Sequence, residues 1–124
     1  MVLDFLKIKN INMEITRTVD TLGNIHYENE DGLHHRENGP AIITYDGTKM
    51  WYINGKLHRE DGPAYENYNS YNAWWINGER HREDGPAIEY ADGNKIWYLN
   101  AKELTEQEFN DLLLRKRLQR IIEL

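Results

Sequence analysis

A ten-residue block that recurs three times, at intervals of 23 residues, constrains the fold more than any other feature of the sequence. The copies run over 32–41, 55–64 and 78–87, and each ends in Gly-Pro-Ala. The same interval relates the tryptophans and asparagines that follow each block: Trp51, Trp74 and Trp97, and Asn54, Asn77 and Asn100. Self-similarity at a fixed period of this length is typical of stacked structural units. We therefore expect three such units over 32–100.

The residues before the first block carry a weaker echo of the repeat. The segment 23–27 is similar to 93–97, with Tyr27 in place of Trp97. This echo indicates a degenerate capping copy, and we expect cap strands within 1–31. A length of 124 residues suits a single domain over 1–124.

Dense turn signals divide each unit into short runs. Asn54-Gly55 and Asn77-Gly78 mark one set of turns, and Asp46-Gly47, Asn69-Ser70 and Asp92-Gly93 mark the other. Asn-Gly and Asp-Gly supply the positive φ that a two-residue hairpin turn requires. The intervening runs, such as 41–45 and 49–53, are strand-sized and rich in β-branched and aromatic residues. The fold class predicted is mainly β, an antiparallel meander of 23-residue hairpin repeats.

The period changes after the third unit. Asn100-Ala101 stands where the earlier units have Asn-Gly, and Thr105 and Glu108 then have the spacing of a capping box. Apolar residues follow at roughly helical spacing: Phe109, Leu112, Leu113, Leu118, Ile121 and Ile122. This pattern predicts a C-terminal α-helix over 105–123 that covers one face or the edge of the sheet.

The alternation of side chains along a strand sorts the aromatic residues into two rows. Trp51, Trp74 and Trp97 share one face, have aliphatic neighbours and are expected to be buried. Tyr52, Trp75 and Tyr98 point the other way. We expect Glu66 and Glu89 to join this second row and to form an exposed face that is aromatic in its rings and acidic at its margins. Cover of this row by the N-terminal strands is the alternative.

The repeat resembles a known family. The His-Arg-x-Asp-Gly-Pro-Ala core, seen at 58–64 and 81–87, and the Trp-Tyr-x-Asn-Gly tail at 51–55 are similar to MORN repeats. The similarity is to a divergent form that recurs in phage and large-virus proteins, and it covers 32–109. The resemblance implies an architecture of hairpin repeats and a binding role, with no shared catalytic residue.

Composition excludes several functions. The chain carries 15 Lys and Arg against 21 Asp and Glu, and the net charge of -6 argues against general nucleic-acid binding. No apolar run approaches the ~20 residues of a membrane span, and Asp4 and Lys7 interrupt the apolar N-terminus, so neither a membrane segment nor a signal peptide is expected. The chain has no cysteine, which fits a reducing compartment. We expect a cytoplasmic protein, in the host cytoplasm if it is viral.

Two ladders of repeated polar residues invite a functional interpretation. His35, His58 and His81 lie ~10 Å apart in a meander and cannot share one metal ion, so we expect hydrogen-bonding histidines, no metal site and no cofactor. Arg36, Arg59 and Arg82 each precede an acidic or amide residue by two positions. We favour a brace for the Asp-Gly-Pro bend, with a row of anion-binding arginines as the alternative.

Catalytic motifs are lacking. The sequence has no nucleophile elbow and no Walker-type phosphate loop. It therefore predicts a non-catalytic protein that binds and blocks or scaffolds a host protein, in the manner of a phage-encoded inhibitor of host defence. The alternative is a sponge for a small anionic nucleotide signal, which a buried, unpaired arginine beside a stacked tryptophan would favour. A homo-oligomer remains open. The candidate binding residues are Tyr52, Trp75, Tyr98, Glu66, Glu89, Arg36, Arg59 and Arg82.

Overall fold

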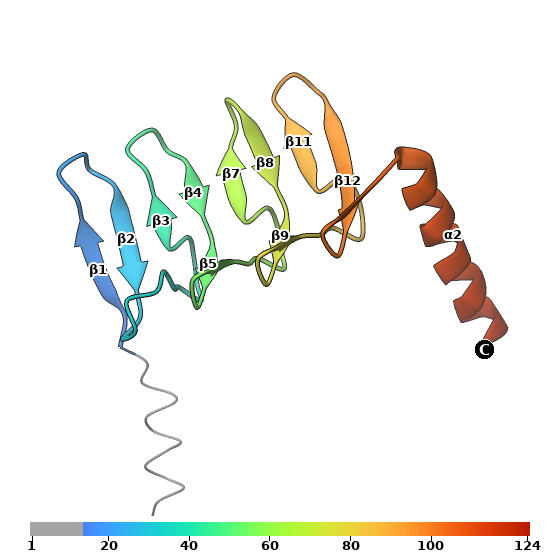
Figure 1. Ribbon diagram of the computed structural model, residues 1–124, viewed down its shortest axis with the longest axis horizontal. Helices are drawn as coiled ribbons and strands as arrows, with labels where there is room; N and C mark the ends of the chain where they lie inside the picture. The colour runs from blue at the N-terminus through green and yellow to red at the C-terminus, as the bar shows by residue number, and fades with distance from the viewer. Residues whose placement is uncertain (1–13) are drawn as a thin grey trace, which may run out of the picture.

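A computed structural model describes residues 14–124 and consists of a row of β-hairpins with one helix at the C-terminal end (Figure 1). Its main sheet is an antiparallel meander in the order β1-β2-β3-β4-β7-β8-β11-β12-β13, and β5–β6 and β9–β10 form two small hairpins. The predicted fold class is confirmed. The elements are β1 (Thr16–Val19), β2 (Ile25–Glu28), β3 (Ile42–Ile43), β4 (Lys49–Met50), β5 (Tyr52–Ile53), β6 (Lys56–Leu57), β7 (Tyr65–Asn67), β8 (Tyr71–Ala73), β9 (Trp75–Ile76), β10 (Glu79–Arg80), β11 (Ile88–Tyr90), β12 (Lys95–Leu99), β13 (Lys102–Leu104) and α2 (Glu106–Ile122).

The β1–β2 hairpin is a unit of the same kind as those that follow. The backbone N–H of Tyr27 donates to the carbonyl of Ala41 over 2.7 Å, and the N–H of Trp51 donates to Ala64 over the same distance. Tyr27 thus occupies the place of the repeated tryptophan. The first part of the predicted cap, 1–13, lies outside the described residues.

The Asn-Gly turns are two-residue turns, as predicted. Asn54 and Gly55 have φ values of 48° and 79°, and the strands on either side pair Ile53 with Lys56. The third turn of this kind places Ala101 at φ 66°, where glycine would be unstrained. In each Asn-Gly turn the glycine N–H donates to a backbone carbonyl. Ala101 makes the equivalent hydrogen bond, since its N–H donates to the carbonyl of Arg80 over 2.9 Å.

The Asp-Gly turns differ from the prediction. The N–H of Thr44 donates to the carbonyl of Thr48, and the N–H of Gly47 donates to Thr44, both over 2.9 Å. The loop therefore contains three residues, 45–47, and only its last residue, Gly47, has a positive φ, of 89°. This loop length pairs Ile42 with Met50, whereas a two-residue turn would pair it with Trp51.

The changed register corrects the predicted faces. In β12, Trp97 alternates with Ile96 and Tyr98, and β11 pairs Glu89 with Lys95 and Ile88 with Ile96. Glu89 therefore lies on the side of the tryptophan row, and the expectation that it joins Tyr98 is wrong. Asn72 pairs with Glu89 on one side and with Glu66 on the other, so Glu66 lies on the same face of the sheet as Glu89. We call this side the arginine face; it carries Trp51, Trp74, Trp97, Arg36, Arg59, Arg82, Glu66 and Glu89. We call the other side the tyrosine face; it carries Tyr52, Trp75, Tyr98, Tyr65 and Ile88.

The fully buried side chains are mostly small. Ala41, Ala64 and Ala87, the last residues of the repeated blocks, have no exposed surface. The tryptophan row is only half-buried, as are Tyr52, Trp75 and Tyr98, so the expected contrast between a buried and an exposed row is wrong. Within residues 14–124 the sheet is a single layer along most of its length, and no second layer covers the large rings.

The helix α2 begins where the capping box predicts. Thr105 is the N-cap, its hydroxyl accepts from the N–H of Glu108, and the Glu108 carboxylate accepts from the N–H of Thr105. That hydrogen bond to the backbone is the main cause that lowers the pKa of Glu108. Phe109 is 2% exposed and anchors the helix against the end of the sheet, together with Leu104. Within the described residues, no helix is both long and apolar enough to span a bilayer.

Candidate functional site

Each repeated arginine lies over an aromatic ring of the preceding unit. The guanidinium carbon is 4.1 Å from the ring centre of Tyr27 for Arg36, 3.8 Å from Trp51 for Arg59, and 3.9 Å from Trp74 for Arg82. Such cation–π contacts contribute about 0.5–2 kcal/mol, according to their exposure. They also cover one face of each indole, which in this sheet has no other layer above it.

The arginines brace the bends, as the sequence predicted. Arg59 donates through Nε to Asp61 (2.9 Å) and through Nη1 to the carbonyl of Pro63 (3.1 Å). Arg82 makes the same bonds to Asp84 and Pro86 and adds an ion pair with Glu89 at 2.8 Å. In the first unit the residue that matches Asp61 is an asparagine, and the guanidinium of Arg36 donates to the carbonyl of Pro40.

The glycine of each Gly-Pro-Ala makes room for the brace. A Cβ added at Gly62 would lie 2.9 Å from the guanidinium carbon of Arg59, and one at Gly85 would lie as close to Arg82. Neither glycine has a positive φ. The position is therefore small because the arginine packs against its backbone.

The histidine ladder is structural. The Nδ1 atoms of His35, His58 and His81 accept from the backbone N–H groups of Asn54, Asn77 and Asn100 at 2.9–3.0 Å. These asparagines have positive φ, so each histidine fixes the left-handed turn at the end of its own unit. Residues 14–124 contain no cluster of three or more histidine or carboxylate side chains arranged to hold a metal ion.

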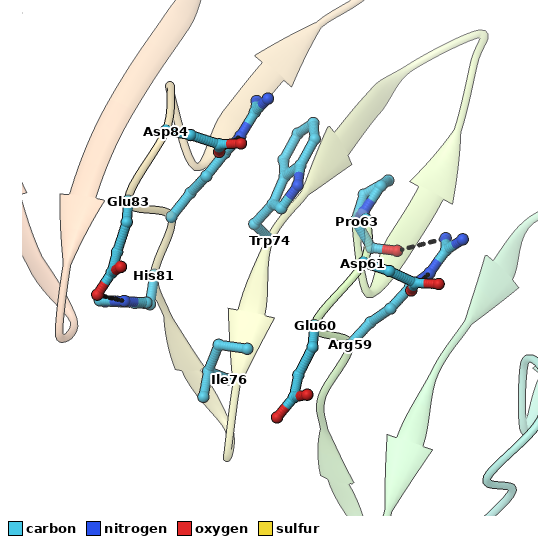
Figure 2. A pocket seen from close by; sticks show the side chains of 11 residues that line it. Arg59, Glu60, Asp61, Pro63, Trp74, Ile76, His81, Glu83 and Asp84 are labelled. Atoms are coloured by element: carbon cyan, nitrogen blue, oxygen red, sulfur yellow. Dashed lines mark hydrogen bonds and ion pairs between the residues drawn. The ribbon is translucent and has the colours of Figure 1, made fainter.

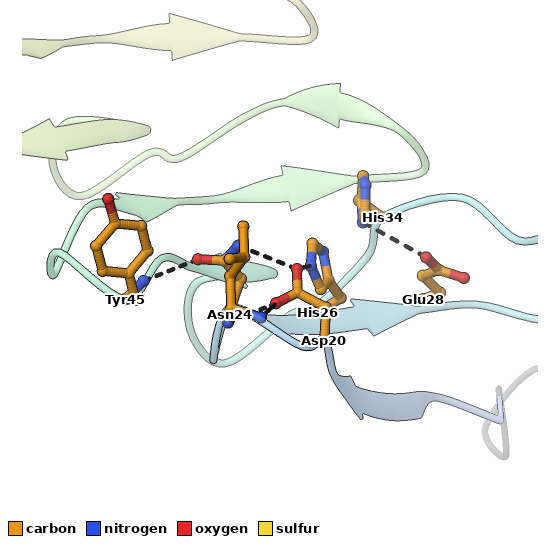
Figure 3. A network of polar contacts seen from close by, with 7 residues as sticks. Asp20, Asn24, His26, Glu28, His34 and Tyr45 are labelled. Carbon is orange, nitrogen blue, oxygen red and sulfur yellow. Dashed lines mark hydrogen bonds and ion pairs between the residues drawn. The ribbon is translucent and has the colours of Figure 1, made fainter.

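Polar side chains of the N-terminal hairpin are likewise used within the fold (Figure 3). Asp20 contacts His26 Nε2 at 3.1 Å and accepts from Asn24, and these bonds, with His26 first, lower its pKa to about 2. Asn24 Oδ1 accepts from the N–H of Tyr45 over 2.8 Å and so ties the cap to the next unit. His34 lies 4.0 Å from Glu28. This network joins two units.

A groove of about 740 Å³ opens on the arginine face between the second and third full repeats. One wall is the 59–63 bend and the other is the 81–84 bend (Figure 2). Trp74 stands between the two bends, with Arg82 stacked on its ring and Ile76 further along the groove. The groove therefore combines an aromatic and an aliphatic side chain on a surface that is otherwise charged.

The groove is acidic. Its four carboxylates, on Glu60, Asp61, Glu83 and Asp84, are between 69% and 87% exposed, while its two arginines are about one fifth exposed and already paired. With His81 neutral, the lining residues carry a net charge of −2. Such a surface attracts cationic groups and repels anionic ones.

The predicted aromatic residues of the tyrosine face have ring and cation neighbours on that face. Tyr52 lies 5.5 Å from the ring of His34, and its burial raises its pKa. Arg80 lies between Trp75 and Tyr98, 5.1 and 5.3 Å from their rings, and donates to the Tyr98 hydroxyl. The Nε atom of Arg80 is buried and has no hydrogen-bond partner among the described residues.

The fold thus divides the predicted site residues. Tyr52, Trp75 and Tyr98 lie on the tyrosine face, and the two glutamates and three arginines lie on the arginine face. Sequence reasoning had assigned Trp74 to the core and Asp61 and Asp84 to the brace alone. The signal for the groove was present in the repeated acidic pairs 60–61 and 83–84, which follow an arginine that must stack on a tryptophan.

Comparisons with known proteins give no relative: no family model, no curated protein and no solved structure matches the chain. The resemblance to MORN repeats therefore stays a prediction.

Proposed function

We propose that this protein is a non-catalytic binding protein that blocks or scaffolds a host protein, and that the partner docks a basic, amphipathic segment into the Trp74 groove. The observation that carries the proposal is the composition of the groove, in which an indole and an isoleucine lie among four exposed carboxylates. A lysine or arginine of the partner would find carboxylates for its charge and the indole for its alkyl chain. The MORN-like resemblance extends the proposal to a phage-encoded inhibitor acting in the host cytoplasm.

The chain itself contains an example of this kind of contact. Lys116, Arg117 and Arg120 of α2 line a small pocket together with Glu83 and Asp84 of the third repeat. The corresponding acidic pair of the second repeat, Glu60 and Asp61, faces the open groove instead. A basic helix of a partner protein could therefore contact the acidic pair of the second repeat in the way that α2 contacts the acidic pair of the third.

The test compares two adjacent tryptophans on opposite faces. The probes are a synthetic peptide of alternating leucine and arginine pairs and the same peptide with glutamate replacing arginine, followed by fluorescence anisotropy. We expect the basic peptide alone to bind, Trp74→Ala to weaken it at least ~10-fold, as loss of a central aromatic anchor does, and Trp75→Ala to leave it unchanged. Thermal melts establish that both variants fold.

The proposal is refuted if the acidic peptide binds as well as the basic one, or if Trp75→Ala weakens binding and Trp74→Ala does not. Once the peptide test succeeds, capture from host lysate with wild-type protein and with Trp74→Ala identifies the partner by mass spectrometry. The partner is the protein that wild type captures and that Trp74→Ala does not.

One observation favours the nucleotide sponge as a second candidate. Arg80 has two aromatic neighbours, a buried Nε without a partner, and no carboxylate within ion-pair distance among the described residues. A panel of cyclic dinucleotides, measured by calorimetry against wild type and Arg80→Gln, tests it. Binding that Arg80→Gln abolishes would support the sponge, and absence of binding would leave the protein-binding proposal alone.

A further inference from the structure

The helix α2 carries two apolar surfaces, and only one of them packs on the sheet. Phe109 is buried, and Leu112 and Leu113 are half-buried on that side. Leu114, Leu118 and Ile121 are 50–65% exposed. Their spacing of four and three residues places them on one stripe of the helix, away from the side that Phe109 occupies.

Two arginines, Arg115 and Arg117, flank this exposed stripe, while Lys116 and Arg120 lie on the side of Phe109, where they line a pocket with Glu83 and Asp84. Arg115, Lys116, Arg117 and Arg120 all lie in the second half of α2, whereas the acidic residues Glu106, Glu108 and Asp111 lie in the first half. The C-terminal half of the helix is thus a cationic segment with exposed aliphatic side chains. It has the chemistry that the Trp74 groove calls for.

We infer that the C-terminal half of α2 of one copy docks into the Trp74 groove of a second copy. The inference rests on the proposed function of the groove and names one occupant for it. The charges are complementary, since the groove lining carries −2 and the exposed stripe is flanked by the cations Arg115 and Arg117. The apolar side chains of the stripe then pack against Trp74 and Ile76 and become buried from water.

The two surfaces lie at different places on the molecule, so the contact is head-to-tail. The helix stands beyond the last hairpin, and the groove lies between earlier ones (Figure 1). A heterologous contact of this kind leaves a free groove at one end of each assembly and a free helix at the other. Copies can therefore add in series, and a partner protein that enters the groove displaces the neighbouring copy.

The test uses the full chain in sedimentation-velocity runs at increasing protein concentration, with two charge-matched pairs of variants. Glu60→Lys alters the groove, and its control Glu37→Lys alters the corresponding position of the first repeat, which has the same histidine contact. Leu118→Glu alters the stripe, and its control Gln119→Glu makes the same change in charge one residue away. Melting curves verify that each variant is folded.

We expect wild type and both controls to associate with rising concentration, more weakly as salt is raised. Glu60→Lys and Leu118→Glu should each raise the dissociation constant at least ~10-fold, because each removes one of the complementary groups. A mixture of these two variants should form a 1:1 pair, since one supplies an intact helix and the other an intact groove. That pair cannot extend further.

Three results would overturn the inference: wild type that stays monomeric, Glu60→Lys that associates like wild type, or a mixture of the two variants that forms no pair. The second result would indicate pairing of helices with each other. If any of these occurs while the basic peptide still binds through Trp74, self-association fails and the proposed function stands. If the peptide also fails to bind, the groove has no role in binding.

Discussion

Replacing Gly62 by alanine should destabilise the protein only as long as Arg59 is present. The new Cβ would lie 2.9 Å from the guanidinium carbon of Arg59, so the side chain must leave its place. It then loses the stack on Trp51 at 3.8 Å and the bonds to Asp61 and to the carbonyl of Pro63. Gly62 lies outside the left-handed region, and an alanine backbone is otherwise tolerated there.

The size of the effect follows from these contacts. A partly exposed cation–π contact contributes about 1 kcal/mol, the hydrogen bond to the Pro63 carbonyl about 1–1.5 kcal/mol, and the exposed pair with Asp61 at most about 0.5 kcal/mol. Against this loss, alanine lowers the entropy of the unfolded chain and stabilises the fold by about 0.4–1 kcal/mol. The net destabilisation is about 2 kcal/mol, or a fall of roughly 8 °C in Tm for a chain of this size.

The decisive assay is a double-mutant cycle followed by thermal and urea unfolding. In an Arg59→Ala background the obstacle is gone and only the entropic gain remains, so Gly62→Ala should raise stability by about 0.4–1 kcal/mol. The same substitution thus changes sign with its background. If it costs the same in both backgrounds, the glycine serves the bend itself and the reasoning about the arginine is wrong.

Three further outcomes are expected. Ala101→Gly should stabilise the fold by about 0.5–1 kcal/mol in urea unfolding, because relief of the left-handed strain exceeds the entropy added to the unfolded chain; Gly78→Ala should lower stability in the same assay. Thr105→Ala should cost about 1 kcal/mol and Thr105→Ser much less, since serine keeps the capping oxygen. The pKa of Asp20 is lowered from 3.8 to about 2, so its contribution to stability is present above pH 3.8 and is lost as pH falls toward 2. The difference in Tm between wild type and Asp20→Asn should therefore be largest above pH 3.8 and vanish as the pH falls below 2.

The Asn-Gly turns and the helix could be predicted because each depends on local sequence. Asn54-Gly55 specifies a two-residue turn through two positive φ values, and Thr105 with Glu108 specifies a helix start. Both signals lie within four residues and need no knowledge of tertiary contacts. The Asn-Gly signal occurs in more than one unit, and the helical spacing of apolar residues after Thr105 supports the predicted helix start.

The faces could not be predicted because they depend on one residue of loop length. Asp46-Gly47 is compatible with a two-residue turn and with a three-residue loop that ends in a left-handed glycine. The second geometry occurs, and it pairs Ile42 with Met50 rather than Trp51. A slip of one residue moves every side chain of a strand to the other face, and so Glu66 and Glu89 changed sides.

The candidate site was predicted in its chemistry and missed in its position. A surface with aromatic rings and carboxylates was expected, and the groove has both, with Trp74 in the place foreseen for Trp75. The four carboxylates of the groove belong to the two bends, and the sequence explained the acidic residues of these bends as partners of Arg59 and Arg82. Only the spatial relation of two successive bends shows that their acidic residues share one hollow.

The alanine core gives this protein an unusual response to mechanical force. Ala41, Ala64 and Ala87 are fully buried, and successive units are joined through main-chain bonds such as that between Trp74 and Ala87. Tension applied to the two ends is resisted by one junction at a time, because each unit contacts only its neighbours. The protein should therefore peel apart in steps, each releasing 23 residues and lengthening the chain by about 80 Å when fully stretched. A bound partner that bridges two bends would appear in such a trace as one junction that yields later than the others.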